Sequence, residues 1–205
     1  MGSRILILSP HTDDAEMGMG ATIIKVMEQF HTIKHVVFSL CSENIPGGFG
    51  DDATYWEFKD ANKNLSDTKV YNFRVREFGY SRQRILDKMV EINKAYDPDM
   101  VFIPCHADIH QDHKVIHQES LRAFKSSNIY GYELIWNVMD GSPSVFSVVN
   151  DTHLNGKMDM IRCYKSQAHR FYTDEEFIRS TAMMRGYQAG FYYAEAFYQY
   201  RTIWK

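Results

Sequence analysis

Two short segments of the sequence concentrate the side chains that most often bind metals or transfer protons. The first, PHTDDAE (10–16), follows an aliphatic run, and the second, HADIHQDH (106–113), follows another. Four of the nine histidines fall within residues 106–117. Imidazole and carboxylate ligands suit a catalytic Zn²⁺, and a set of three leaves one coordination position open for water. Water held in that way becomes acidic, so the two segments point to a metal-dependent hydrolase.

The first segment also permits two other interpretations. Its three acidic residues suit the first turn of a helix, where Asp is a good N-cap, although capping needs only one of them. Gly18 and Gly20, with Glu43 further along the chain, form a fragment of a dinucleotide-binding fingerprint. The third glycine of that fingerprint is missing, and the acidic side chains would repel a pyrophosphate. Nucleotide binding is therefore the weakest interpretation of this segment.

The hydrophobic pattern predicts the elements that position both segments. Continuous apolar runs are typical of buried strands, and the amphipathic stretches between them are typical of helices. The predicted strands are 5–9, 36–41, 69–73, 100–104, 129–136 and 144–150. The predicted helices are 16–30, 54–65, 81–96, 155–166 and 174–187. This order predicts an α/β fold, a Rossmann-like three-layer sandwich with a mainly parallel central sheet, formed by a single domain over 1–205.

In such sheets, ligands bind where the carboxyl ends of strands meet the following helices. If strand 100–104 lies beside strand 5–9, the two segments face each other at that edge. His11 and Asp14 would then combine with a histidine of the second segment in a site of two histidines and one carboxylate. His110 and His113 are three residues apart on a helix and can converge on one point, so at least one of them is expected as a ligand.

Other groups of the second segment are expected to have structural roles. His117 lies one turn beyond His113 and is expected at the protein surface. His106 and Asp108 are expected only to shape the loop.

Together, PHTDDAEMGMGATI and HADIHQDH resemble the two motifs of the LmbE-like or PIG-L superfamily of zinc-dependent N-deacetylases. The family motifs read His-Pro-Asp-Asp-x-Glu and His-x-Asp-His, and Thr12 replaces the usual proline here. The stretches PDMVFIPCHADIHQDH and CYKSQ…RGYQAGFYYAEAF extend the resemblance over most of the chain. Members of this superfamily act on N-acetylglucosamine-type sugars joined to inositol, malate, lipid, nucleotide or other sugars. The resemblance implies a hydrolase of a linear amide C–N bond that removes acetyl from such an amino sugar or its conjugate.

The resemblance also assigns roles to individual positions. The implied zinc ligands are His11, Asp14 and His113. Asp13 matches the general base that acts on the activated water, and His110 matches the residue that stabilises the oxyanion or assists as an acid. Asp112 matches a carboxylate that holds the His110 imidazole in its charged form. Other divalent metals, such as Fe²⁺, Co²⁺ or Ni²⁺, suit the same ligands.

The remaining pocket residues are less well indicated. The glycine-rich segment 42–56 is expected to form a mobile rim, in which Phe49, Tyr55 and Trp56 either stack on a sugar or pack beneath the loop. Further pocket candidates are His169, Arg185 and Glu195, and a structural role is favoured for each.

The family resemblance implies a small-molecule amino-sugar conjugate as the substrate, and the composition gives no sign of a macromolecular partner of the two commonest charged kinds. A net charge of −3 gives no electrostatic reason to expect nucleic acid or an anionic membrane. No apolar run approaches the ~20 residues that span a bilayer, and three separated cysteines are typical of a cytoplasmic protein. The many aromatic residues of 185–204 predict a subunit contact and hence a homo-oligomer. Two alternatives stay open: a metal-dependent hydrolase of another amide or ester bond, and a non-catalytic nucleotide-binding protein.

Overall fold

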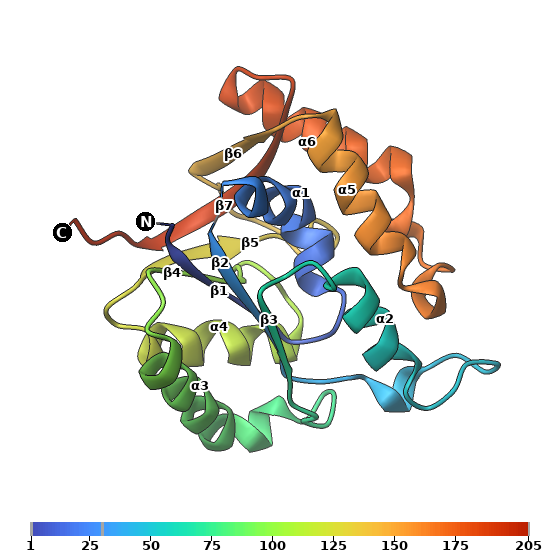
Figure 1. Ribbon diagram of the computed structural model, residues 1–205, viewed down its shortest axis with the longest axis vertical. Helices are drawn as coiled ribbons and strands as arrows, with labels where there is room; N and C mark the ends of the chain where they lie inside the picture. Colours follow the sequence, from blue (N-terminus) through green and yellow to red (C-terminus); the bar gives the residue numbers. More distant parts are fainter. Residues whose placement is uncertain (1, 30, 205) are drawn as a thin grey trace.

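The computed structural model describes residues 2–29 and 31–204, and these residues form one seven-stranded sheet at the centre of the molecule (Figure 1). The strand order is β3-β2-β1-β4-β5-β7-β6. The strands are β1 (Arg4–Ser9), β2 (Thr32–Val37), β3 (Asp67–Val70), β4 (Met100–Pro104), β5 (Asn128–Tyr132), β6 (Val145–Val149) and β7 (Tyr193–Arg201). The first five pair in parallel, and β7 runs antiparallel between β5 and β6. The predicted α/β class with a mainly parallel sheet is confirmed.

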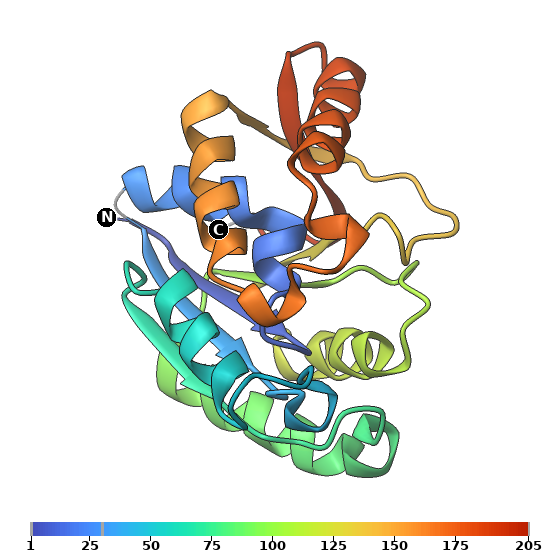
Figure 2. The same cartoon turned by 90° about the vertical axis from the view of Figure 1, so that its right-hand side faces the viewer.

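Helices cover both faces of this sheet (Figures 1 and 2). The six α-helices among the described residues are α1 (Asp14–Glu28), α2 (Ala53–Ala61), α3 (Arg82–Tyr96), α4 (Gln111–Ala123), α5 (Asp151–Arg162) and α6 (Glu175–Ala189). Leu6 and Leu8 of β1 belong to a core cluster with residues of α3 and α4, whereas Ile5 and Ile7 belong to another with residues of α1. Because β1 is buried on both faces, its sequence is a continuous apolar run rather than an alternating one.

Helix α1 is kinked at Met19, whose φ of −148° and ψ of 22° lie outside the helical region. The kink frees backbone N–H groups, and the carboxylate of Glu195 on β7 accepts those of Ala21 (3.2 Å) and Thr22 (2.6 Å). Lys157 of α5 donates to the same carboxylate at 2.7 Å. A buried ion pair thus holds α1 at its kink.

The glycines that suggested a dinucleotide fingerprint serve close packing of α1. A Cβ on Gly18 would lie 2.5 Å from a ring carbon of Tyr132, and one on Gly20 would lie 2.8 Å from Cγ of Lys157. Both positions are inside the helix rather than in the loop before it. Their glycines therefore have a structural explanation that does not involve a phosphate group.

The largest departure from the predicted elements is β7, for which the sequence analysis assigned no strand. Its residues Tyr193, Phe197 and Tyr198 are buried, and β7 separates β5 from β6. Strand β2 begins four residues earlier than predicted. The hydrophobic pattern does not indicate this start because His35 is polar, although its side chain points into the core and is hydrogen-bonded there. Residue 30, the predicted end of the first helix, lies outside the described residues, and α1 ends at Glu28.

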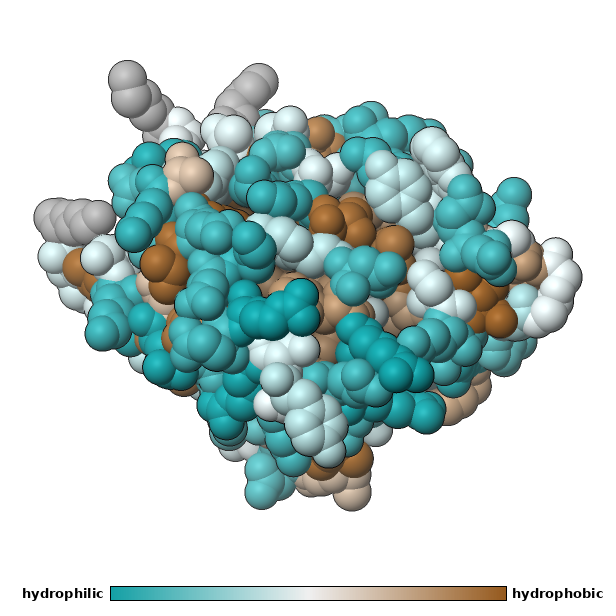
Figure 3. Space-filling model, turned by 90° about the horizontal axis from the view of Figure 1, so that it is seen from below, coloured by the Kyte–Doolittle hydropathy of each residue, from teal (hydrophilic) through white to brown (hydrophobic). Residues whose placement is uncertain are grey.

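The surface seen in Figure 3 is mainly hydrophilic, with hydrophobic residues in small separate groups. Within the described part of the chain, each helix is too short or too polar to cross a lipid bilayer.

Candidate metal and catalytic site

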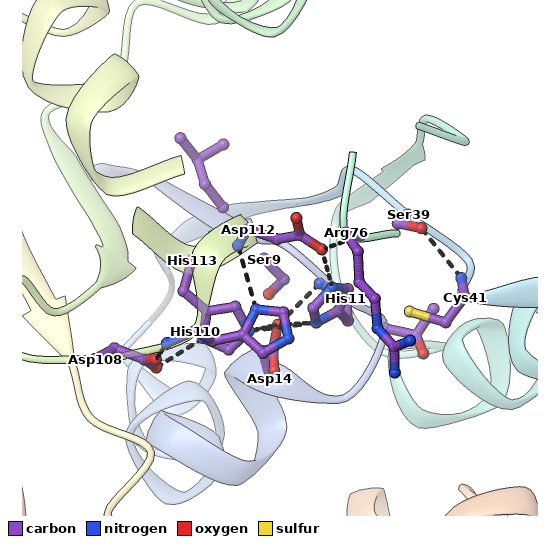
Figure 4. A network of polar contacts seen from close by, with 12 residues as sticks. Ser9, His11, Asp14, Ser39, Cys41, Arg76, Asp108, His110, Asp112 and His113 are labelled. Carbon is purple, nitrogen blue, oxygen red and sulfur yellow. Dashed lines mark hydrogen bonds and ion pairs between the residues drawn. The ribbon is translucent and has the colours of Figure 1, made fainter. Parts of the chain in front are cut away.

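The candidate site lies where β1 and β4 end. These strands pair in parallel, with Ile5 opposite Met100 and Ile7 opposite Phe102, so their carboxyl ends lie side by side. The loop from β1 into α1 carries His11, and the loop from β4 into α4 leads to His113 (Figure 4). The expected adjacency of the two motif-bearing strands is confirmed.

Three donor atoms, from the loop after β1 and from the first turns of α1 and α4, form a nearly equilateral triangle. Nδ1 of His11 and Nε2 of His113 each lie 3.4 Å from Oδ2 of Asp14, and the two nitrogens are 3.3 Å apart. Ligands bound at 2.0–2.1 Å in a tetrahedral zinc site are about 3.3–3.4 Å from one another. The three side chains therefore already have the spacing of three corners of a metal tetrahedron.

Two further carboxylates orient the imidazoles of this triangle. Asp108 Oδ2 lies 2.6 Å from Nδ1 of His113, and Asp112 Oδ2 lies 3.2 Å from Nε2 of His11. A carboxylate accepts the proton of the ring nitrogen that it contacts, so the opposite nitrogen of each ring presents its lone pair to the triangle. Asp108 is expected from the sequence only to shape the loop, but it makes this orienting contact with His113. Its position in the loop, five residues before His113 on the helix, is the sequence feature that could have indicated the contact.

His110 is the N-cap residue of α4, and its contacts differ from those expected. Its Nδ1 accepts the backbone N–H of Asp112 at 3.2 Å, whereas the Asp112 carboxylate contacts His11 and the backbone N–H of Arg76 (2.7 Å). Burial, together with the nearby imidazoles of His113 and His11, lowers the pKa of His110 to about 4. A neutral imidazole with Nδ1 as acceptor carries its proton on Nε2. Among the described residues, the Asp112 carboxylate makes no hydrogen bond to the His110 ring, and the role expected for His110 stays a prediction.

Two different groups of residues have the spacing of a metal site. His11, His110 and His113 have donor atoms within 4.8 Å of one another, while the triangle described above contains Asp14 in place of His110. The set with Asp14 fits a metal better, because all three of its distances match a tetrahedral edge. It also leaves His110 available for another role.

Burial and charge separate the two adjacent aspartates. Burial, together with the neighbouring Asp14 carboxylate, raises the pKa of Asp13 to about 7. Burial acts in the same direction on Asp14, but the imidazoles of His113 and His11 hold the pKa of Asp14 well below its ordinary value. Asp14 is therefore the ionised carboxylate of the pair, and Asp13 is a carboxyl group able to exchange a proton near neutral pH.

Helix capping does not account for the acidic residues of the first segment. Asp13 is the N-cap of α1, but its side chain makes no capping hydrogen bond. Glu16 is fully buried and accepts hydrogen bonds from the side-chain amide of Asn62 and from the hydroxyl of Tyr164 (2.7 Å). Tyr164 also lies 2.6 Å from the carbonyl of Thr12, so Glu16 is tied through Tyr164 to the loop that carries His11.

His117 was expected at the surface, and this prediction is wrong. The residue is only 8% exposed, and its Nδ1 lies 3.0 Å from the carbonyl of Pro104. Because the backbone leaves β4 at Pro104, that carbonyl needs a donor, and His117 supplies one from the inner side of α4. His106 also has a structural contact, since its Nδ1 and backbone N–H both lie 2.8 Å from the hydroxyl of Tyr200.

A cavity of about 340 Å³ opens beside the triangle, and Asp13, His110 and the three triangle residues line it. Phe49, Tyr55 and Trp56, the aromatic candidates of the predicted rim, are not among the described residues that line it. Its aromatic wall is instead formed by Trp136 and Tyr172, whose rings stack at 4.2 Å and 5°.

The polar side of the cavity also contains residues that the sequence analysis did not single out. They are Cys41, Asn44, Arg76, Asn137, Gln167 and Arg170. The three later candidates lie elsewhere: Arg185 pairs with Glu133 (2.6 Å), Glu195 supports α1, and His169 lines a different hollow. The loops that carry Arg76 and Arg170 have no motif, so only their position in the fold reveals them.

The sequence of this chain matches that of a known protein family. A family model described as PIG-L, GlcNAc-PI de-N-acetylase, matches residues 6–124, more than half of the chain and both motifs. The uncharacterized deacetylase YaiS of Escherichia coli is 27% identical over 173 residues, which are 79% of this chain and 90% of YaiS.

Two solved structures show the same fold at lower identity. N,N'-diacetylchitobiose deacetylase of Pyrococcus horikoshii has a TM-score of 0.79 and 22% identity, over 97% of this chain and 84% of its own. The 4-carboxy-2-hydroxymuconate hydratase GalB of Pseudomonas putida has a TM-score of 0.80 and 18% identity, over 100% and 99%. Since these two enzymes are named for different reactions, the shared fold alone does not decide the chemistry. The match of the family model does decide the relationship: the chain belongs to the PIG-L family of GlcNAc-PI de-N-acetylases.

Proposed function

We propose that the protein is a metal-dependent N-deacetylase that removes the acetyl group from an N-acetylated amino sugar or its conjugate. The observation that carries this proposal is the triangle of His11, Asp14 and His113 at the edge of a cavity that Asp13 and His110 also line. The catalytic unit is a single domain over 1–205 with the Rossmann-like three-layer arrangement. Membership of a deacetylase family supports the choice of an acetamide as the bond that is hydrolysed.

In this proposal His11, Asp14 and His113 hold the metal. Two imidazole nitrogens and one carboxylate oxygen form a donor set that suits Zn²⁺ and also accepts Fe²⁺, Co²⁺ or Ni²⁺. When bound, the metal polarises the acetamide carbonyl and makes a nearby water molecule more acidic. Asp108 and Asp112 hold the two imidazoles in the tautomers that this role requires.

The residues of the chain then divide the proton transfers and the charge stabilisation between them. Asp13 accepts a proton from the water molecule that attacks the carbonyl carbon, and its pKa near 7 suits a general base at neutral pH. His110 donates its Nε2–H to the carbonyl oxygen as negative charge develops there. The proton held by Asp13 passes to the departing amine, so that acetate and a free amino sugar leave.

Acetate release from the chitin disaccharide N,N'-diacetylchitobiose and from N-acetylglucosamine, measured with and without a chelator, tests this proposal. We expect release of acetate and a primary amine in equal amounts, its loss after chelation, and its recovery on addition of Zn²⁺ or Co²⁺. Release that is insensitive to complete metal removal would overturn the metal dependence. Phosphate or another acid released from parallel substrates, with no acetate from any N-acetyl sugar, would favour a hydrolase of a different bond.

The cytoplasmic location and the homo-oligomer expected from the sequence stay predictions. Tyr187, Phe191, Tyr192 and Trp204 are exposed near the end of the chain, which is compatible with a subunit contact.

A further inference from the structure

We propose that the cavity contains an oxyanion subsite formed by Arg76 and Arg170, and that the N-acetylated sugar which binds there carries a phosphate or carboxylate group. This inference rests on the proposed function and adds to it the charge class of the substrate. Three features of the described residues support it.

The first feature is the contrast between these two arginines and all the others. Nine of the eleven arginine side chains have an acidic, carbonyl or aromatic partner in the structure. For Arg76 and Arg170 the described residues provide no hydrogen bond or ion pair to the guanidinium, and both line the site cavity. In Figure 4 the Arg76 side chain extends beside His11 and its guanidinium has no dashed contact. Both arginines whose guanidinium groups lack such a partner among the described residues therefore line the same cavity.

The second feature is the composition of the cavity wall. Asp13 and Asp14 beside the triangle are the only acidic residues among the described residues that line the cavity. The other polar groups include the carboxamides of Asn44, Asn137 and Gln167, which can donate hydrogen bonds to an oxyanion. Guanidinium groups bind phosphate and carboxylate through paired, charge-assisted hydrogen bonds. These side chains thus give the cavity wall the chemistry of an anion site, in a chain whose net charge is −3.

The third feature is that hydrogen bonds fix the main chain of both arginines. Arg76 has a φ of +65°, an unfavourable conformation for a residue with a side chain. Its N–H donates to Asp112 at 2.7 Å, and its carbonyl accepts from the side chain of Gln111 at 3.0 Å. Arg170 donates its N–H to the carbonyl of Gln167 at 2.9 Å, and its own carbonyl accepts the hydroxyl of Thr173 at 2.8 Å. The contacts of Arg76 also link it directly to Asp112, which orients a triangle imidazole.

The test compares charged and uncharged sugars in the zinc-loaded full chain. One arm measures kcat/KM for acetate release from N-acetylglucosamine 1-phosphate, N-acetylmuramic acid, UDP-N-acetylglucosamine and neutral methyl N-acetylglucosaminide. A second arm titrates glucosamine 1-phosphate and glucosamine calorimetrically, which requires no turnover. The variants are Arg76→Gln and Arg170→Gln, and Arg84→Gln is the control because it removes the same charge from an exposed side chain that packs over Phe73, outside the cavity.

We expect at least one charged sugar to exceed the neutral one by about 10-fold or more in kcat/KM, and glucosamine 1-phosphate to bind more tightly than glucosamine. Each cavity variant should reduce the charged-to-neutral ratio by about 10-fold, while Arg84→Gln should leave it unchanged. The charged sugar with the highest kcat/KM shows whether the subsite prefers a phosphate, a diphosphate or a carboxylate. Equal binding of the two titrated sugars, or a preference that survives both cavity substitutions, would overturn the subsite. Absence of acetate from every sugar would overturn the proposed function instead, and the titration would still decide the subsite.

Discussion

Six of the seven buried carboxylates among the described residues fall into two groups with different partners, and Glu16, which is held by Asn62 and Tyr164, belongs to neither. Away from the site, Glu119 contacts Arg82 and Arg122, Glu133 contacts Arg185, and Glu195 contacts Lys157. At the site, the partners of the three buried aspartates are imidazoles and backbone N–H groups, with no lysine or arginine side chain among the described contacts. These aspartates are Asp14, Asp108 and Asp112.

A buried carboxylate is stable only when its charge is compensated. In the first group, the compensating cation is a lysine or arginine side chain of the protein. Those charges are therefore neutralised within the chain, and the ion pairs stabilise the fold. In the second group, the strongest compensation within the chain is protonation of an imidazole: although burial opposes it, the carboxylates of Asp14 and Asp112 raise the pKa of His11 well above its ordinary value. A metal ion at the triangle would replace that proton. The carboxylates of the first group therefore stabilise the fold, whereas the charge of the second group is available to a bound cation.

The largest effect expected from this comparison concerns Asp13, which belongs to neither group. Asp13→Asn should preserve metal binding and reduce kcat for acetate release by about 10²–10⁴-fold, because a carboxamide cannot accept the proton of water. Metal content and steady-state kinetics measured on the same preparation check this expectation. Asp51→Asn removes an exposed carboxylate and should behave as wild type. Turnover within a few-fold of wild type in the zinc-loaded Asp13→Asn variant would remove Asp13 from the role of base.

The next effect concerns the charges that build the fold. Lys157→Met should lower the free energy of unfolding by about 3–5 kcal/mol, since Glu195 would keep a buried charge without its cation. Adding Glu195→Gln to this variant should recover part of the loss. Urea denaturation checks both expectations, and Lys88→Met, which removes one side of an exposed pair with Glu91, should have no measurable effect. A stable Lys157→Met protein would show that Glu195 does not depend on its partner.

Much of this arrangement could be predicted from the sequence, because the hydrophobic runs and the two motifs are local signals. The run 5–9 and the run 100–104 each correspond to a strand, and the motif that follows each strand lies where a parallel sheet places it. The family resemblance is confirmed by the match over residues 6–124. The roles assigned to the individual site residues stay predictions.

The parts that could not be predicted depend on contacts between distant segments. Strand β7 lacks the β-branched residues that mark β4, and its two buried faces gave no alternating pattern. The contact of the Asp112 carboxylate with His11 rather than with the ring of His110 depends on how α4 begins, which its sequence does not reveal. The burial of His117 accompanies its contact with the carbonyl of Pro104 at the end of β4, and this contact forms only once α4 packs against the sheet.

A smaller effect is expected from Asp108, which tests whether the second group of carboxylates serves the metal. Asp108→Asn removes the charge that orients His113 and should weaken zinc affinity by about 10–100-fold. A competition titration with a chromophoric chelator measures the affinity, and Asp140→Asn, at an exposed position, is the control. If Asp108→Asn bound zinc as tightly as wild type, the orienting contact would have no role in metal binding.

His35 sharpens the comparison because it is a buried titratable group without any formal counter-charge in hydrogen-bonding contact. It is fully buried beneath the site, with Nε2 at 2.8 Å from the hydroxyl of Ser9 and Nδ1 at 3.0 Å from the side-chain carbonyl of Asn62. Burial lowers its pKa to about 4, whereas an unfolded chain has a histidine pKa of about 6.5. Between these values the unfolded state binds more protons, so the contribution of His35 to stability is complete above pH 6.5 and decreases as the pH falls toward 4.

Relative to pH 7.5, His35 should therefore lower the free energy of unfolding by about 2 kcal/mol at pH 5. Urea denaturation at both pH values should show that His35→Gln loses this part of the pH dependence, while His169→Gln, at an exposed position, keeps it. Because wild type and His35→Gln differ in no other titrating group, the difference between their slopes isolates His35. Parallel slopes for wild type and His35→Gln would mean that this buried imidazole accepts a proton in the folded protein, where the carboxylate of Glu16, 3.9 Å from its Nδ1, would compensate the charge.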